Sequence, residues 1–354
     1  MQKIRVLVVG CGNMGSSHAR AYHNIEEFEI AGLVSRKPES REKLSAELGG
    51  LPVFEDFGEA LSVTTPDAVS INTYPDTHAA YIRESLQAGA HVFVEKPLAL
   101  TVEEAQDLVN LAQKKNRKMV VGYILRVHPA WERFVELARG LGKPLVMRMN
   151  LNQQSSGKHW YTHKQLMKSM SPIVDCGVHY VDIMCLMTGS KPISVSAIGA
   201  RLSDEIDSEM YNYGQLQVRF EDGSVGWYEA GWGPMISETA FFVKDVIGPK
   251  GCVSIMDLDK GDSDDVDSHS KTGMLLLHHS HTDGDGNFTR EDEQINTSDE
   301  PDHDGLCRLE QELFLKAITE DLDLSDHLRD AINSLKIVLA ADTSYRNGKT
   351  VMLT

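Results

Sequence analysis

The stretch VVGCGNMGSSHA, residues 8–19, decides the fold of this chain. Its three glycines stand in G-x-G-x-x-G spacing, where an apolar strand-like run meets an amphipathic helix-like segment. In that context the first glycine permits a tight turn, the second lets backbone approach a pyrophosphate, and the third lets the helix pack against the strand. The helix N–H groups then face the phosphates. A glycine-rich turn without a ligand is the alternative. The residues predicted to contact a dinucleotide here are Gly10, Gly12, Asn13, Met14 and Gly15.

Short apolar runs alternate with longer amphipathic segments up to residue 125. Near-continuous apolar strands between helices are typical of a parallel sheet covered on both faces. We therefore expect an α/β fold with a Rossmann dinucleotide-binding domain over residues 1–125. Its predicted helices are 13–24, 38–48, 75–88 and 101–116.

The pattern changes from residue 126 onward. Strand-like runs separated by hairpin turns indicate a large, mostly antiparallel sheet, so that residues 126–354 form a second α/β domain. Residues 257–304 carry much of the negative charge, and we expect long exposed loops there around a strand at 273–279. The helices predicted in this domain are 129–139, 306–320 and 325–346.

Composition narrows the class of protein. The 354 residues are 41% hydrophobic and carry a net charge of −17, which argues against sequence-independent binding of nucleic acid. No run of about 18 apolar residues occurs, so we expect no membrane span. The N-terminus runs directly into a strand and lacks a signal peptide. Five scattered cysteines without a CxxC pair are typical of a reduced, cytoplasmic protein.

The end of the second strand bears on cofactor choice. An acidic residue there would bind the ribose hydroxyls of NAD, but the chain has Ser35 followed by Arg36. Arg36 could accommodate a 2′-phosphate, so NADP(H) is favoured over NAD(H). The alternatives are that Arg36 stacks on adenine or lies in solvent.

Four further motifs follow the glycine turn in order: INTYPDTHA at 71–79, VEKPLA at 94–99, GYILRVHP at 122–129 and DCGVHYVDI at 175–183. With them, most of the chain resembles the glucose–fructose oxidoreductase / inositol dehydrogenase / rhizopine catabolism (Gfo/Idh/MocA) family. The resemblance implies a Rossmann domain and a C-terminal α/β domain with a large open sheet. It also implies pyranose- or cyclitol-type substrates, NAD(H) or NADP(H), and dimers or tetramers formed through the open sheets.

Lys96 is the first catalytic candidate. It follows an apolar strand, and ligands of open α/β sheets bind beyond the carboxyl ends of the strands. Pro97 cannot continue a central ladder, so the chain leaves the sheet there. The resemblance implies that Lys96 contacts the reacting oxygen and that the Lys96–Pro97 bond is cis. An exposed turn lysine is the alternative. Glu95 could pair with Lys96, contact the cofactor or cap a helix, and these roles stay open.

Asp175 and His179 are the other catalytic candidates. They lie four residues apart, so a helix over 174–187 would place them on one face. A carboxylate beside an imidazole orients it and raises its basicity. The resemblance implies that His179 accepts the proton in alcohol oxidation and that Asp175 supports it and the substrate. Metal binding with Asp182, or a buried structural histidine, is the alternative.

Several weaker candidates surround these. The family pattern often has glycines before the catalytic helix, whereas this chain has KSMSPIVD at 168–175, which leaves the substrate rim in doubt. A polar and aromatic cluster at 158–163 could stack on sugar faces, or be an ordinary loop. The histidine-rich stretch 278–287 fails the spacing of a calcium loop, and we predict no metal. The cofactor candidates are Thr73, Pro75, His78, Glu95, Lys96 and Arg126. The substrate candidates are Tyr123, Trp160 and Tyr161, together with Lys96, Asp175 and His179.

Lys96, Asp175 and His179 together predict a cytoplasmic NAD(P)-dependent oxidoreductase acting on a sugar, sugar phosphate or cyclitol. A glycosidase that uses bound NAD transiently is one alternative. A sensor that binds dinucleotide without turnover is the other.

Overall fold

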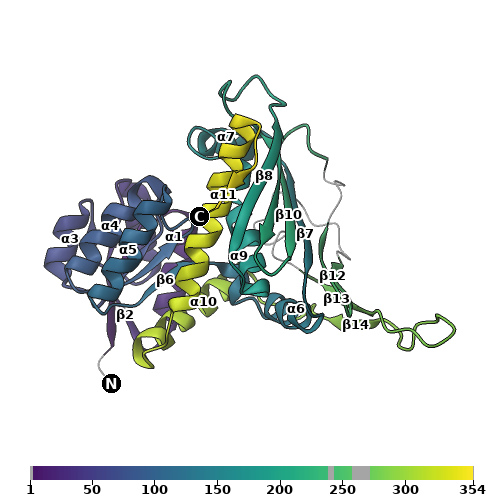
Figure 1. The fold of residues 1–354 in the computed structure, drawn as a ribbon. Helices are drawn as coiled ribbons and strands as arrows, with labels where there is room; N and C mark the ends of the chain where they lie inside the picture. Colours follow the sequence, from purple (N-terminus) through teal and green to yellow (C-terminus); the bar gives the residue numbers. More distant parts are fainter. Residues whose placement is uncertain (1–2, 238–242, 257–271, 354) are drawn as a thin grey trace. The chain divides into compact units, whose positions relative to one another are not determined.

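The computed structural model describes residues 3–237, 243–256 and 272–353 (Figure 1). The chain forms two compact units: Met1–Val127 with Pro301–Ile332, and His128–Glu300 with Asn333–Thr354. We expected residues 126–354 to stay together, but residues 301–332 belong to the first unit. None of the helices in the described ranges combines the length and apolar character needed to span a membrane.

The sheet of the first unit is parallel, as predicted, and has six strands, one of which was not predicted. Its order, β3-β2-β1-β4-β5-β6, places β1 at the centre, where the direction of winding reverses. Ligands of such sheets bind beyond the carboxyl ends of the strands at this switch point. The strands are β1 (Ile4–Val9), β2 (Phe28–Val34), β3 (Val53–Phe54), β4 (Ala68–Ile71), β5 (His91–Glu95) and β6 (Met119–Gly122).

Helices alternate with these strands. The predicted segments are present, and α3 was not predicted, although Asp56 caps it by accepting a hydrogen bond from the Glu59 N–H at 2.8 Å. The elements are α1 (Asn13–Asn24), α2 (Pro38–Glu47), α3 (Phe57–Thr64), α4 (Pro75–Gln87), α5 (Val102–Lys114) and the 3₁₀ turn η1 (Ile124–Arg126).

Helix α10 (His303–Thr319) explains why residues 301–332 return to the first unit. Its Phe314 is fully buried, 6.4 Å from Phe28 and 6.1 Å from Phe93 between ring centroids. Helix α10 also packs along α1. The hydrophobic effect favours burial of the Phe314 side chain against β2 and β5, and this burial holds α10 in the first unit although it lies far along the sequence.

The second unit is built on a nine-stranded, mostly antiparallel sheet, as predicted. Its order is β14-β13-β12-β11-β7-β10-β9-β8-β15, and β7 and β10 are the parallel pair. The strands are β7 (Val146–Gln154), β8 (Pro192–Ala200), β9 (Tyr213–Phe220), β10 (Val225–Gly233), β11 (Lys244–Gly248), β12 (Gly251–Met256), β13 (Met274–His279), β14 (Glu293–Asn296) and β15 (Val351–Met352).

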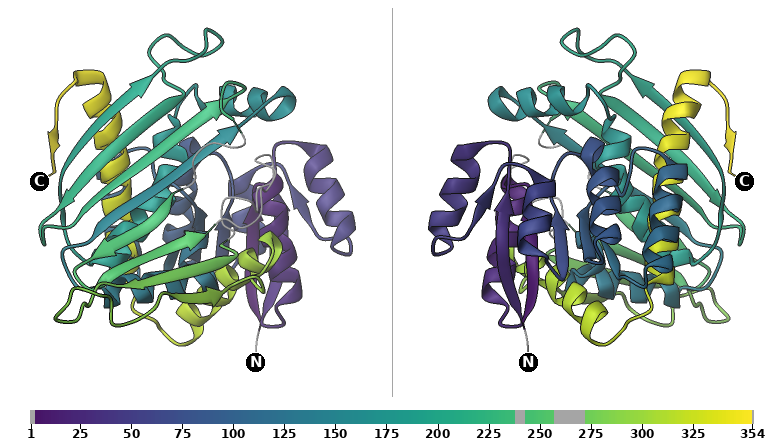
Figure 2. Two further views of the ribbon diagram at one scale, coloured as in Figure 1. Left: turned by 90° about the vertical axis from the view of Figure 1, so that its right-hand side faces the viewer. Right: turned by 90° about the vertical axis from the view of Figure 1, so that its left-hand side faces the viewer.

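Helices α6 (Pro129–Gly140), α8 (Pro172–Asp175) and α9 (Gly177–Thr188) pack against this sheet. The left view of Figure 2 looks onto the sheet from the side away from these helices. Tyr180 of α9 and Tyr228 of β10 are buried and stack with ring centroids 5.0 Å apart. The remaining helices are α7 (Gly157–Leu166) and α11 (Ser325–Asn347).

The acidic segment at 257–304 was expected to be loops around one strand. Strand β13 lies where that strand was expected, and β14 is an addition. Residues 257–271 lie outside the described residues. Gly223, in the predicted turn between β9 and β10, has φ +84°, which explains the glycine at that turn.

Candidate active site

The glycine turn between β1 and α1 has the geometry that a dinucleotide requires. Gly10 has φ +94°, and a Cβ there would lie 2.4 Å from the carbonyl oxygen of Asn72. A Cβ on Gly15 would lie 1.8 Å from the Gly10 carbonyl oxygen. A Cβ on Gly12 would meet no described atom within 4 Å, so the turn is open at this position. Gly10 and Gly15 therefore serve the packing of the turn, while Gly12 leaves room for a phosphate group.

Helix α1 begins at this opening. Its N-cap is Gly12, and no side chain of the described residues caps the helix there. The first N–H groups of a helix have no partner within the helix, and they attract anions. The residues present thus fit a dinucleotide pyrophosphate.

A second arginine, Arg41, lies at the end of β2 in addition to the predicted Arg36. Arg36 is exposed beside a hollow lined by several carboxylates, including Glu55 and Glu59. Arg41 donates to the Ser35 carbonyl oxygen at 2.6 Å and lies 3.6 Å from Glu55. Sequence reasoning missed Arg41 because the contact depends on α2 turning back over the end of β2. A 2′-phosphate here would meet cations and carboxylates together.

The end of β5 places Lys96 where it was predicted. The Lys96–Pro97 peptide bond is cis, as the resemblance implied. Glu95 is buried, and its Oε1 lies 2.8 Å from Nε2 of His18 in α1. Burial opposes ionisation of Glu95, but the hydrogen bond to His18 and the electrostatic interactions with His18, Lys96 and His78 together outweigh it, and the pKa of Glu95 lies below its ordinary value. Sequence reasoning missed His18, which stands one turn into the helix that the glycine motif opens.

The loop after β4 is tied to the turn after β5. His78 is fully buried, with Nδ1 2.9 Å from the Pro97 carbonyl oxygen and Nε2 3.0 Å from the Thr73 carbonyl oxygen. Burial lowers the pKa of His78. Thr73 Oγ1 lies 2.6 Å from Thr77 Oγ1, and Pro75 begins α4. The expected cofactor contacts of Thr73, Pro75 and His78 stay predictions.

Tyr123 and Arg126 follow β6. Tyr123 is buried, with its ring 6.2 Å from that of His327. Arg126 donates to Oδ2 of buried Asp330 at 3.0 Å. Both partners come from α11, which sequence reasoning did not connect with this strand. Contacts of Tyr123 with substrate and of Arg126 with cofactor stay predictions.

In the second unit, Asp175 and His179 do not share one regular helix. We predicted a helix over 174–187, but α8 ends at Asp175, and α9 begins at Gly177. The interruption at Cys176 places Asp175 at the end of one helix and His179 in the first turn of the next. Both residues are half-buried, whereas Asp182 is fully buried.

Cys176 and its neighbours were also missed as a group. The Cys176 thiol lies 3.6 Å from Oδ2 of Asp175 and 3.7 Å from Oε1 of Gln153, at the end of β7. Gln153 Oε1 also accepts from Nε1 of Trp232 at 2.8 Å. Asp175 is therefore linked through Cys176 and Gln153 to the ring of Trp232.

The polar and aromatic cluster at 158–163 forms helix α7 rather than a loop. Trp160 is buried, and its Nε1 donates to Glu205 at 3.1 Å. Tyr161 is 60% exposed. His163 stacks on Trp232 with centroids 4.3 Å apart and an interplanar angle of 9°. Substrate contacts of Trp160 and Tyr161 stay predictions.

Each unit thus presents its own part of the candidate chemistry. The first has a turn shaped for a dinucleotide, with a lysine after a neighbouring strand of the same sheet. The second has a half-buried carboxylate and imidazole near an aromatic surface. Secondary-alcohol oxidation needs a proton acceptor and a group that polarises the oxygen, and these residue types can supply both.

Comparison with known proteins agrees with these features. UDP-N-acetylglucosamine 3-dehydrogenase of Acidithiobacillus ferrooxidans is 32% identical over 58% of this chain, and the match spans 62% of that relative. The scyllo-inositol 2-dehydrogenase (NAD(+)) of Bacillus subtilis is 26% identical over 99% of this chain and 96% of that relative. GenD2 from gentamicin A biosynthesis, solved in complex with NAD, shares the fold with a TM-score of 0.78 and 21% identity, covering 100% of this chain and 97% of GenD2.

Two family models together span most of the chain. One, described as "Oxidoreductase family, NAD-binding Rossmann fold", matches residues 4–123. The other, described as "GFO/IDH/MocA C-terminal domain", matches residues 137–251. The chain belongs to the Gfo/Idh/MocA oxidoreductase family.

Proposed function

We propose that this protein transfers a hydride between a nicotinamide cofactor and a secondary alcohol or ketone of a sugar, sugar phosphate or cyclitol. One observation carries the proposal: Lys96 follows β5 at the carboxyl edge of the sheet whose β1–α1 turn leaves room for a dinucleotide at Gly12. The names of the two relatives, which act on an amino-sugar nucleotide and an inositol, support this substrate class.

The chain's own residues would divide the work as follows. The cofactor, when bound, supplies or takes the hydride. The Lys96 ammonium donates a hydrogen bond to the reacting oxygen and stabilises the charge that develops on it. His179 exchanges the hydroxyl proton, and Asp175 orients His179. The proposed cofactor contacts are those of the glycine turn, Ser35, Arg36 and the residues after β4, β5 and β6.

The experiment is cofactor reduction or oxidation measured against a panel of sugars, sugar phosphates and inositols. We expect Lys96→Ala and His179→Ala to lose turnover, with cofactor affinity unchanged in His179→Ala and still measurable in Lys96→Ala. Val63→Ala, at a 66% exposed position of α3, serves as the control with near-normal turnover. Full turnover in Lys96→Ala or His179→Ala would refute the assignment. Release of aglycone from aryl glycosides without net cofactor reduction would favour a glycosidase instead.

We also propose a preference for NADP(H) over NAD(H). Ser35 replaces the acid that would bind ribose hydroxyls, and both Arg36 and Arg41 are close to the end of β2. Titration of NADPH and NADH by nicotinamide fluorescence tests this preference. Weaker NADPH binding in Arg36→Ala, with NADH binding unchanged, is expected. A clear preference of the unaltered chain for NADH would contradict it, and the carboxylates beside Arg36 would be the cause.

The proposed setting is a cytoplasmic homodimer or homotetramer. The support is a nine-stranded sheet with exposed apolar side chains on several strands, among them Val146, Ile198 and Val225. Extended sheet faces with apolar residues favour association. Light scattering after size exclusion would give the mass, and a monomer at micromolar concentration would contradict this proposal.

A further inference from the structure

A group of polar side chains lies buried beneath the end of β5. His18 and Gln311 are fully buried, Glu310 is 2% exposed and Glu95 is 8% exposed. They come from α1, α10 and β5, all within the first unit. Buried polar groups are costly unless they are hydrogen-bonded, so such a group needs a structural or functional reason.

Three of these side chains, Glu95, His18 and Gln311, form a directed chain of hydrogen bonds. Both carboxyl oxygens of Glu310 lie outside it. His18 Nε2 lies 2.8 Å from Glu95 Oε1, and His18 Nδ1 lies 2.9 Å from Gln311 Nε2. A carboxylate only accepts, so Nε2 carries the proton. The Gln311 amide nitrogen only donates, so Nδ1 accepts. The two partners therefore hold the ring in one tautomer and one orientation.

This chain of hydrogen bonds ends at Lys96, the residue proposed to carry the chemistry. Glu95 Oε2 accepts from the Lys96 backbone N–H at 3.3 Å, while its Oε1 is held by His18. On the other side of Lys96, the Pro97 carbonyl oxygen is 2.9 Å from His78 Nδ1. One neighbour of Lys96, Glu95, is thus held by buried His18 through its side chain, and the carbonyl of the other, Pro97, faces buried His78.

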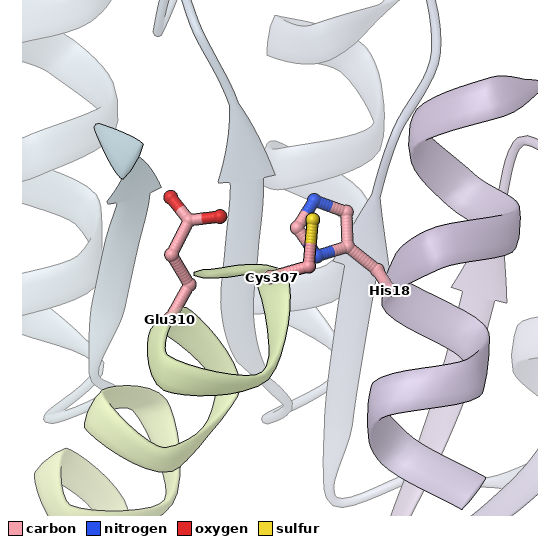
Figure 3. A group of neighbouring side chains, drawn as sticks. All are labelled: His18, Cys307 and Glu310. Carbon is pink, nitrogen blue, oxygen red and sulfur yellow. The ribbon is translucent and has the colours of Figure 1, made fainter. Parts of the chain in front are cut away.

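A metal ion is the other explanation for such a group. His18, Cys307 and Glu310 offer ligand atoms within 4.8 Å of one another, and their residue types suit zinc. Figure 3 shows His18 on α1 facing Cys307 and Glu310 on α10. Both nitrogens of His18 are already engaged, however. Burial and the charge of Glu95 raise the pKa of Glu310 well above its ordinary value. A metal on His18 would have to displace Glu95 or Gln311 from the ring, so the hydrogen-bond chain accounts for His18 better.

We propose that His18 and Gln311 are positioning residues that fix Lys96 through Glu95. This inference rests on the proposed function of Lys96. Small displacements of a catalytic group, and loss of the partners that orient it, both lower turnover without removing the group itself.

The test measures kcat, substrate KM and cofactor Kd in His18→Leu, His18→Gln and Tyr22→Phe. His18→Leu should lower kcat by about tenfold to a hundredfold, the range for loss of orienting partners, with KM and Kd nearly unchanged. His18→Gln, whose amide can still donate to Glu95, should restore most of kcat. Tyr22→Phe is the matched control, because Tyr22 is equally buried one turn further along α1, and its hydroxyl has no partner among the described residues.

Three outcomes would overturn the proposal: unchanged kcat in His18→Leu, no rescue in His18→Gln, or stoichiometric zinc that is lost in Cys307→Ser. If His18→Leu does not fold, Gln311→Leu tests the other end of the hydrogen-bond chain. An unchanged kcat in Gln311→Leu would also overturn the proposal. Lys96→Ala separates the two proposals. Full turnover in Lys96→Ala defeats the proposed function, whereas lost turnover there with normal kcat in His18→Leu defeats only the positioning role.

Discussion

The two glycines at the ends of G-x-G in the β1–α1 turn should respond differently to the same added methyl group. Gly10→Ala forces a non-glycine residue to φ +94° and brings its Cβ to 2.4 Å from the Asn72 carbonyl oxygen. Positive φ costs about 1 to 2 kcal/mol and overpacking about 1 to 3 kcal/mol, which together give about 2 to 5 kcal/mol. That is a large part of the stability of an ordinary domain.

Gly12→Ala should spare the fold and weaken the cofactor. Gly12 has φ −81°, and its Cβ would meet no described atom within 4 Å. Alanine is a poorer N-cap than glycine by up to about 1 kcal/mol, but reduced freedom of the unfolded chain offsets about 0.4 to 1 kcal/mol. The methyl group would instead occupy space for the pyrophosphate. Overpacking of about 1 to 3 kcal/mol corresponds to a loss of about tenfold or more in cofactor affinity.

Urea unfolding of the cofactor-free protein measures the first effect, and nicotinamide fluorescence titration measures the second. The expected result is a destabilised Gly10→Ala, and a Gly12→Ala of normal stability with weakened binding. Normal cofactor affinity in Gly12→Ala would refute the placement of the pyrophosphate at this turn. Equal destabilisation of both variants would refute the packing argument.

Three other substitutions test the surroundings. Glu310→Gln should raise the free energy of unfolding more at pH 8 than at pH 5. The pKa of Glu310 is raised in the folded state, so its contribution to folding stability is fully present below the unfolded pKa of about 4.3 and is lost as pH rises above it. An equal gain at both pH values in urea unfolding would contradict this reasoning. Arg126→Ala should cost about 1 to 3 kcal/mol, because Asp330 is 2% exposed and loses one of its two arginine partners, while Arg329 stays 3.0 Å from Oδ1. Recovery of stability when Asp330→Leu is added would support that cause, and no recovery would oppose it. Trp232→Phe removes the hydrogen bond to Gln153 but keeps an aromatic ring, so thermal unfolding should show a loss of about 1 kcal/mol, and no loss would contradict the bond.

Most of the fold could be predicted from the alternation of strand-like and helix-like segments in the sequence. The parallel sheet, the larger antiparallel sheet and the place of Lys96 were predicted correctly, because each rests on local periodicity or on a motif in context. The return of α10 to the first unit was not predicted. Its apolar face is visible in the sequence, but the residues that Phe314 packs against, Phe28 and Phe93, lie more than 200 positions earlier in the chain.

The same limit applies to the candidate site. Glu95 had several possible roles, and the structure pairs it with His18 across 77 positions of sequence. Gln311 contacts His18 across 293 positions. Neither contact has a local signature. The interruption at Cys176 is another example, because the apolar residues on either side of Asp175, Cys176 and Gly177 keep a spacing compatible with a single continuous helix.

The most direct test of the central claim follows a hydrogen label. A polyol or sugar deuterated at the carbon that bears the reacting hydroxyl is incubated with oxidised cofactor, and the reduced nicotinamide is analysed by mass spectrometry. The account predicts that the unaltered chain transfers the label to the nicotinamide, and that Lys96→Ala binds cofactor but transfers little. Cofactor binding without label transfer for any member of the substrate panel, or full transfer by Lys96→Ala, would contradict it.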